Sequence, residues 1–138
     1  MSDKITIHGG CHCGAVKFSA KVERKNKVLV CNCSICKTSG YEHLIVAKTD
    51  FNLSNGVEQL SSYKFGTGQA NHLFCKNCGV KSFYQPRSHP DCYSIHLKCL
   101  DDVSGLEITR ESFDGQNWEK SRAALNENKN SDLNSELN

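Results

Sequence analysis

Apolar and polar residues alternate in short runs along most of this chain. Between Ala15 and Val22 every second residue is apolar, so Val16 and Phe18 would lie on one face of an extended segment and Lys17 on the other. Alternation at period two is typical of a β-strand with one buried face. Further runs that favour strands occupy residues 27–30, 43–47, 60–65, 70–74, 81–84 and 93–97. Glycine, asparagine and proline separate these runs, and the pattern predicts an all-β domain.

The C-terminal part of the chain has a different pattern. Helical periodicity is weak throughout the sequence, except between Trp118 and Leu125. After Leu125 the chain is polar and nearly free of bulky apolar residues, so it cannot offset its ordering entropy by burial. We therefore expect one folded domain over residues 1–125 and a disordered tail over residues 126–138.

Composition narrows the class of protein. The 138 residues suffice for one domain with a core, and the hydrophobic content of 38% is low enough that metal sites would contribute to folding. No apolar stretch is long enough for a membrane span or a signal peptide, so we expect a cytoplasmic or nuclear protein without a membrane partner. The formal net charge is +2 and no run of Lys and Arg occurs, so nucleic acid is not an expected partner.

Most of the nine cysteines fall into three tight clusters. The clusters are Cys11 and Cys13, then Cys31, Cys33 and Cys36, then Cys75 and Cys78. An odd cysteine count with C-x-C and C-x-x-C spacing favours metal ligation in a reducing compartment over disulfides. The cysteines of a C-x-C pair are also poor disulfide partners, because the bond requires a specific Cα separation. The clustered thiolates divide naturally into a closed set of four and an open set of three.

Two glycines suggest which cysteines form each set. Gly14 follows Cys13 and Gly79 follows Cys78, and glycine allows a positive φ at which backbone N–H groups turn toward the sulfurs. The two pairs followed by glycine would therefore form one closed, structural zinc site, made of Cys11, Cys13, Cys75 and Cys78. A second zinc ion with one open position, where chemistry can take place, would be held by Cys31, Cys33 and Cys36.

The ordered set of cysteine motifs resembles one known family. The stretches Gly10–Val16 (GCHCGAV), Cys31–Cys36 (CNCSIC) and Phe74–Gly79 (FCKNCG) are similar to those of the glutathione-dependent formaldehyde-activating enzymes. The resemblance covers roughly residues 7–122, nearly the whole expected domain, and continues through Pro86–Ser88, Cys99–Asp101 and Phe113–Lys120.

This resemblance implies a fold and a function. The implied fold is an Mss4-like, zinc-binding β fold of antiparallel sheets, with one structural and one active-site zinc ion. The implied activity is that of a carbon–sulfur lyase acting on a glutathione–aldehyde adduct, such as S-hydroxymethylglutathione formed from formaldehyde. The catalytic set would be Cys31, Cys33 and Cys36. The alternative is a non-enzymatic, zinc-stabilised binding module associated with chromatin or the cytoskeleton, because fold does not settle function.

Cationic side chains near the open zinc site are candidates for binding the carboxylates of glutathione. Lys37 directly follows the third cysteine of the open set. Arg87 lies in the loop between Pro86 and Pro90, where a bidentate contact with a carboxylate is plausible. Two further candidates on a late predicted strand are His96 and Lys98.

The remaining cysteines and histidines give weaker signals. Cys99 is expected either to approach the open zinc as a fourth ligand or to be a small buried hydrophobic residue. Cys92 follows a Pro-Asp turn and is expected to be an exposed thiol. His12 lies between two ligands and is expected to point away from the metal. The spacing of His43 and His72 does not suggest ligation.

Overall fold

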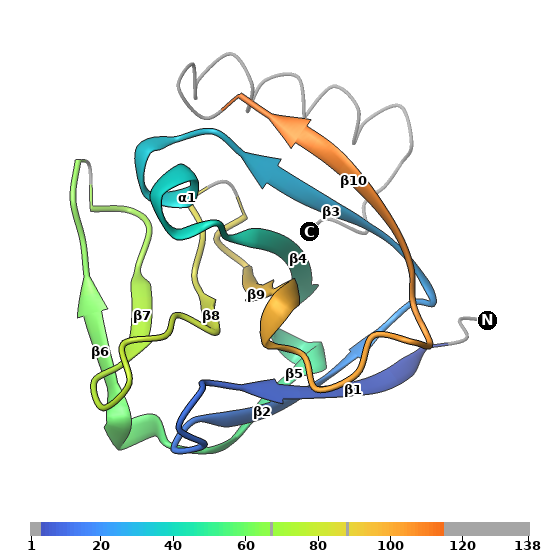
Figure 1. The fold of residues 1–138 in the computed structure, drawn as a ribbon, viewed down its shortest axis with the longest axis horizontal. Helices are drawn as coiled ribbons and strands as arrows, with labels where there is room; N and C mark the ends of the chain where they lie inside the picture. The colour runs from blue at the N-terminus through green and yellow to red at the C-terminus, as the bar shows by residue number, and fades with distance from the viewer. Residues whose placement is uncertain (1–3, 67, 88, 115–138) are drawn as a thin grey trace.

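The computed structural model describes residues 4–66, 68–87 and 89–114. Within these ranges the chain forms three β-sheets arranged around one centre (Figure 1). The all-β fold class that the alternation predicted is confirmed. The tail expected over residues 126–138 and the helical segment expected from Trp118 to Leu125 lie outside the described residues.

The first sheet is antiparallel, and its strand order is β1–β2–β5. It consists of β1 (Ile5–Gly10), β2 (Lys17–Val22) and β5 (Phe51–Asn55). The register of β1 with β2 begins with Ile5 opposite Val22 and ends with Gly10 opposite Lys17. The last paired residue of β1 is therefore the residue before the first cysteine.

The second sheet has five strands in the order β10–β3–β4–β9–β8. They are β10 (Glu107–Phe113), β3 (Lys25–Cys31), β4 (Glu42–Ala47), β9 (Cys92–His96) and β8 (Phe83–Tyr84). β10 runs parallel to β3, whereas the other neighbours are antiparallel. The third sheet is the hairpin of β6 (Leu60–Tyr63) and β7 (His72–Cys75).

Helical structure in the described ranges is limited to short segments. They are the α-helix α1 (Ser34–Ser39) and the 3-10 helices η1 (Lys48–Asp50), η2 (Val57–Gln59) and η3 (Leu97–Cys99). Gly40 ends α1 in the left-handed conformation, with φ of 70°, and its N–H donates to the carbonyl oxygen of Cys36. This helix was not predicted. It begins immediately after Cys33 and contains Cys36.

The predicted strands agree well with those observed. The predicted runs correspond to β2, β3, β4, β6, β7, β8 and β9, with boundaries that differ by a few residues. β1, β5 and β10 were not predicted. Each cysteine cluster follows or includes the end of a strand, because β1 stops just before Cys11, β3 ends at Cys31 and β7 ends at Cys75.

The core lies between the first and second sheets. Val16 and Phe18 are buried and Lys17 is exposed, as the alternation predicted. The ring of Phe18 packs against the rings of Phe51 and Phe83, with centroids 5.2 and 5.8 Å apart. Since Phe18 and Phe51 belong to the first sheet and Phe83 to the second, this aromatic cluster joins the two sheets.

A close backbone approach fixes the turn that carries the first cysteine. A Cβ atom added at Gly10 would overlap the carbonyl oxygen of Val16. That same oxygen accepts a hydrogen bond from the N–H of Cys11, at 3.1 Å. Glycine is therefore required at position 10, because any larger residue would push Cys11 out of the turn.

Candidate metal centres

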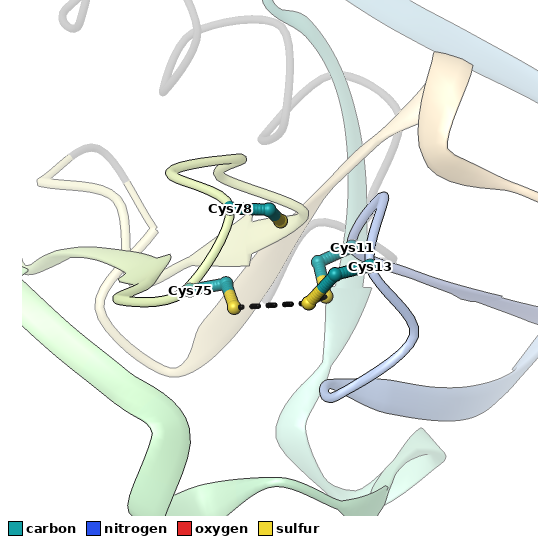
Figure 2. A group of neighbouring side chains, drawn as sticks. All are labelled: Cys11, Cys13, Cys75 and Cys78. Atoms are coloured by element: carbon teal, nitrogen blue, oxygen red, sulfur yellow. Dashed lines mark hydrogen bonds between the residues drawn. The ribbon is translucent and has the colours of Figure 1, made fainter.

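Four sulfurs from two distant segments meet at one point of the fold. Cys11 and Cys13 come from the turn between β1 and β2, whereas Cys75 ends β7 and Cys78 lies in the turn that follows it (Figure 2). All four Sγ atoms lie within 4.8 Å of one another. The Sγ–Sγ distances from Cys13 to Cys11 and to Cys75 are both 3.7 Å. Tetrahedral zinc with Zn–S bonds of about 2.3 Å requires sulfurs about 3.8 Å apart, so this cluster fits the ion.

Backbone N–H groups surround these four sulfurs, as the glycines suggested. Gly14 and Gly79 have positive φ values of 86° and 79°. The N–H of Val16 donates to Sγ of Cys11 at 3.3 Å, and the N–H of Asn77 donates to Sγ of Cys75 at 3.4 Å. Such donors stabilise thiolates, which are the metal-binding form of cysteine.

Three sulfurs form a second, entirely local group. Cys31 ends β3, Cys33 immediately precedes α1, and Cys36 lies within α1. Their Sγ atoms are within 4.8 Å of one another, and in the described part of the chain no further His, Cys, Asp or Glu belongs to this group. The first turn of α1 closes the loop, because the N–H of Lys37 donates to the carbonyl oxygen of Cys33 at 2.8 Å. The result is a compact loop with three ligand atoms and no fourth.

The ionisation of these three thiols is linked. Hydrogen bonds from Cys31 and then Cys36 lower the pKa of Cys33, so Cys33 is the first of the three to ionise. Hydrogen bonding with Cys31 and Cys33, and then burial, raises the pKa of Cys36 far above its ordinary value. All three can be thiolates together only if a cation compensates their charge, and a divalent metal ion does this. The donor set therefore fits zinc as well as the four-sulfur cluster does.

His43 contacts the three-sulfur group through Cys36. Its Nε2 lies 3.1 Å from Sγ of Cys36, and its Nδ1 lies 2.9 Å from Oγ of Ser94. The hydroxyl of Tyr84 is also near Nδ1, at 3.4 Å. Since both hydroxyls can donate to Nδ1, the arrangement favours the tautomer in which Nε2–H donates to the sulfur of Cys36. Burial lowers the pKa of His43 to about 3, so the imidazole is neutral at neutral pH.

A cavity of about 420 Å³ opens beside the three-sulfur group. Its polar lining consists of Cys31, Cys33, Ser34, Cys36, His43, His72 and Arg87. Its other walls are formed by Leu29, Ile35, Ile45, Phe65, Gly66, Ala70, Tyr84, Pro86 and Phe113. None of the four sulfurs of the first cluster is among these lining residues. The cavity therefore gives a small molecule access to only one of the two clusters.

The sequence of the chain matches a known family over most of its length. Residues 6–116 match the family described as glutathione-dependent formaldehyde-activating enzyme. The chain belongs to this family. It is also similar to the crystal structure of a Rhodobacter sphaeroides protein determined as a structural genomics target. The two chains are 31% identical with a TM-score of 0.62, and the match covers 74% of this chain and 99% of the other. Together with the sheets, this match shows the Mss4-like fold class that the family resemblance implied.

Of the side chains predicted to bind the carboxylates of glutathione, one lines the cavity. Arg87 lines the cavity, whereas Lys37 is exposed on α1 and does not line it. His96 is also outside the lining, and its ring stacks on that of Tyr41 with centroids 4.4 Å apart. Lys98 is exposed in η3. None of the described helices is long and apolar enough to cross a membrane.

The two cysteines outside the clusters differ in burial, because Cys92 is buried and Cys99 is partly exposed. Cys92 was expected to be exposed, and this was wrong: it is 1% exposed, because it pairs with Ala47 in the ladder between β4 and β9. Cys99 does not join the three-sulfur group. Burial, and then the charges of Cys11 and Cys78, raises the pKa of Cys99 to about 11. Cys99 is therefore a neutral thiol beside the four-sulfur cluster.

Proposed function

We propose that this protein is a zinc-dependent carbon–sulfur lyase that acts on adducts of glutathione with aldehydes. The observation that carries the proposal is that, of the two sulfur clusters, only the three-sulfur group lines a cavity. Cys31, Cys33 and Cys36 all line the cavity, whereas the four-sulfur cluster does not. The family's description as glutathione-dependent and formaldehyde-activating supports the same substrate class.

Each cluster has its own role in this proposal. The structural zinc ion would be held by Cys11, Cys13, Cys75 and Cys78. The active-site ion would be held by Cys31, Cys33 and Cys36, and its contribution is to lower the pKa of a substrate thiol that enters the cavity. His43 fixes the orientation of Cys36 through the contact at 3.1 Å.

Two cavity residues would bind and orient the substrate. Arg87 supplies a guanidinium group, which suits a carboxylate of glutathione. His72 accepts a hydrogen bond at Nδ1 from Nζ of Lys81, at 3.0 Å, which leaves its Nε2–H as a donor. Burial, and then the charge of Lys81, lowers the pKa of His72 to about 4, so it is neutral at neutral pH. A neutral donor of this kind stabilises an oxygen atom that gains negative charge during the reaction.

The reaction is an addition with a balanced proton transfer. The sulfur of glutathione attacks the carbonyl carbon of the aldehyde, and a C–S bond forms as the C=O double bond becomes a single bond. The proton lost by the thiol ends on the former carbonyl oxygen, which gives a hemithioacetal. The lyase direction is the reverse, with the C–S bond breaking and the thiol and aldehyde regenerated.

The alternative is a non-enzymatic binding module. This alternative is drawn from a resemblance of the stretches Cys33–Lys37, Cys78–Tyr84 and Phe113–Lys120 to those of animal centromere protein V. A purely structural second site would be closed by a fourth protein ligand. The described residues offer no fourth ligand to the group of Cys31, Cys33 and Cys36, and this favours the lyase.

Zinc stoichiometry combined with a glutathione titration tests the proposal. We expect two zinc ions per chain, of which one is perturbed or released by glutathione and the other is not. We also expect faster hemithioacetal formation from formaldehyde and glutathione than in a protein-free blank, which is needed because thiols add to formaldehyde without a catalyst. One zinc ion per chain, or two that do not respond to glutathione, would contradict the proposal and favour the binding module.

A further inference from the structure

A row of aromatic rings leads from the surface into the cavity. Tyr63 and Phe65 stack with centroids 5.6 Å apart, and Phe65 and His72 stack at 5.4 Å. His72 in turn stacks on Tyr84 at 4.7 Å, with an interplanar angle of 15°. We call these four residues the aromatic row. Three of its four rings, those of Phe65, His72 and Tyr84, line the cavity, so the row forms an aromatic side of the cavity.

The outer end of the aromatic row is about half exposed. Tyr63 is 51% exposed and Phe65 is 44% exposed, whereas Tyr84 at the inner end is 5% exposed. Large apolar side chains at the mouth of a cavity are a common feature of ligand sites. Phe65 itself lines the cavity together with His72 and Tyr84. The exposed ring is therefore part of the binding surface.

Further apolar side chains line the cavity. Leu29 and Ile45 come from β3 and β4, Ile35 comes from α1, and Phe113 comes from the end of β10. Arg87 is the one lining residue with a permanent charge among the described residues. Such a lining offers one contact for a carboxylate and a large area for apolar groups, and a hydroxymethyl group would leave that area uncovered.

We propose that the preferred substrate is a glutathione adduct whose aldehyde part carries an apolar, aromatic group larger than that of formaldehyde. The proposal rests on the lyase function proposed above and specifies its substrate class. The aromatic group lies against Phe65 and the apolar walls, with the sulfur of the adduct at Cys31, Cys33 and Cys36. The C–S bond forms or breaks as already described, so no further reactant is needed.

Binding of two stable thioethers tests this inference without any chemical step. S-benzylglutathione and S-methylglutathione share the peptide and differ only in the apolar group on sulfur. Isothermal titration of the zinc-loaded protein should show about tenfold tighter binding of the benzyl compound, because burying the additional apolar carbons is favourable. Equal affinity for both compounds would overturn the inference.

Variants of Phe65 test whether the preference for the benzyl compound arises in the cavity. Phe65→Ala should lose most of the preference for the benzyl compound, and Phe65→Tyr, which keeps the ring, should retain it. Val57→Ala is the matched control, since Val57 is 69% exposed and does not line the cavity. Circular dichroism checks that each variant is folded, as expected for an exposed position. A preference that survives in folded Phe65→Ala would also overturn the inference.

A rate measurement separates this inference from the proposed lyase function. Phenylglyoxal and methylglyoxal both form hemithioacetals with glutathione, and each rate is compared with its own protein-free blank. We expect the larger acceleration with phenylglyoxal, and loss of that difference in Phe65→Ala. Acceleration of both aldehydes to the same extent would overturn the substrate class while leaving the lyase intact. A benzyl preference in binding with no acceleration of either aldehyde would uphold the apolar site and overturn the lyase.

Discussion

The two sulfur clusters use the same ligand chemistry in two different settings. The four-sulfur cluster joins Cys13 to Cys75, which are 62 residues apart in the sequence. The three-sulfur cluster takes all its ligands from residues 31–36, at the junction of β3 and α1. A metal ion in the first cluster therefore closes a long loop between two hairpins, whereas one in the second organises only a short segment.

The two clusters also differ in their position relative to the cavity. Both clusters receive backbone N–H groups on sulfur and contain one buried cysteine, but none of the sulfurs of the first cluster lines the cavity. The cysteines of the second cluster line the cavity, and Sγ of Cys36 contacts Nε2 of His43. The comparison teaches that cysteine spacing alone does not decide the role of a metal site. We infer the two proposed roles from the number of segments that each cluster joins and from the space beside its ligands.

The largest expected effect comes from breaking the four-sulfur cluster. Cys75→Ser removes a ligand with 0% exposure that joins the two hairpins. A structural zinc ion contributes about 10–16 kcal/mol of binding free energy in small domains, comparable to the whole stability of about 5–15 kcal/mol. We expect the variant to be unfolded at 25 °C by circular dichroism and to contain no bound zinc. The control, Cys99→Ser, should stay folded, and a Cys75→Ser variant with unchanged melting would refute the structural role.

The next effect separates chemistry from folding. Cys33→Ser removes one of three local ligands, so the second zinc ion should be lost while the first remains. Thermal melting should change little, because the core and the four-sulfur cluster are intact, and acceleration of hemithioacetal formation should fall to the level of the blank. Metal analysis by mass spectrometry gives the readout. Loss of both metals together would show that the division into four and three sulfurs is wrong.

Local patterns in the sequence were enough for much of the fold. β2 was predicted because apolar residues such as Phe18 and Val22 alternate with polar residues such as Lys17, and this alternation needs only one buried face. β10 was missed because most of its residues are exposed and it pairs with β3, far away in the sequence. α1 was missed because its six residues are too few to show helical periodicity, and a hydrogen bond to Cys33 holds its first turn.

The sequence predicted the parts of the site whose residues lie close together in the chain, and it missed those that come from distant strands. The cysteines could be grouped from their spacing within each turn and from the glycines that follow Cys13 and Cys78, although those two turns are distant in the sequence. His43 and Ser94 are 51 residues apart and meet through the pairing of β4 with β9, which no short motif signals. His72 reaches the cavity from another hairpin for the same reason. Cys92 was misjudged because a Pro-Asp turn suggests exposure, while its burial depends on the neighbouring strand.

The smallest expected effect comes from removing the contact between His43 and Cys36. It tests whether this contact affects metal binding at the second cluster alone. His43→Ala removes the donor to Sγ of Cys36 but leaves all three sulfurs in place. Loss of a partner that orients a metal ligand typically weakens metal affinity by about 10–100-fold, so we expect this loss at the second site alone. Competition with a chelator measures the affinity of each site separately. His43→Gln, whose amide nitrogen can replace Nε2, should recover part of the affinity, because the donor to sulfur is restored. If the alanine variant lost affinity equally at the four-sulfur cluster, the effect would be one of general packing, and the contact between His43 and Cys36 would have no specific role.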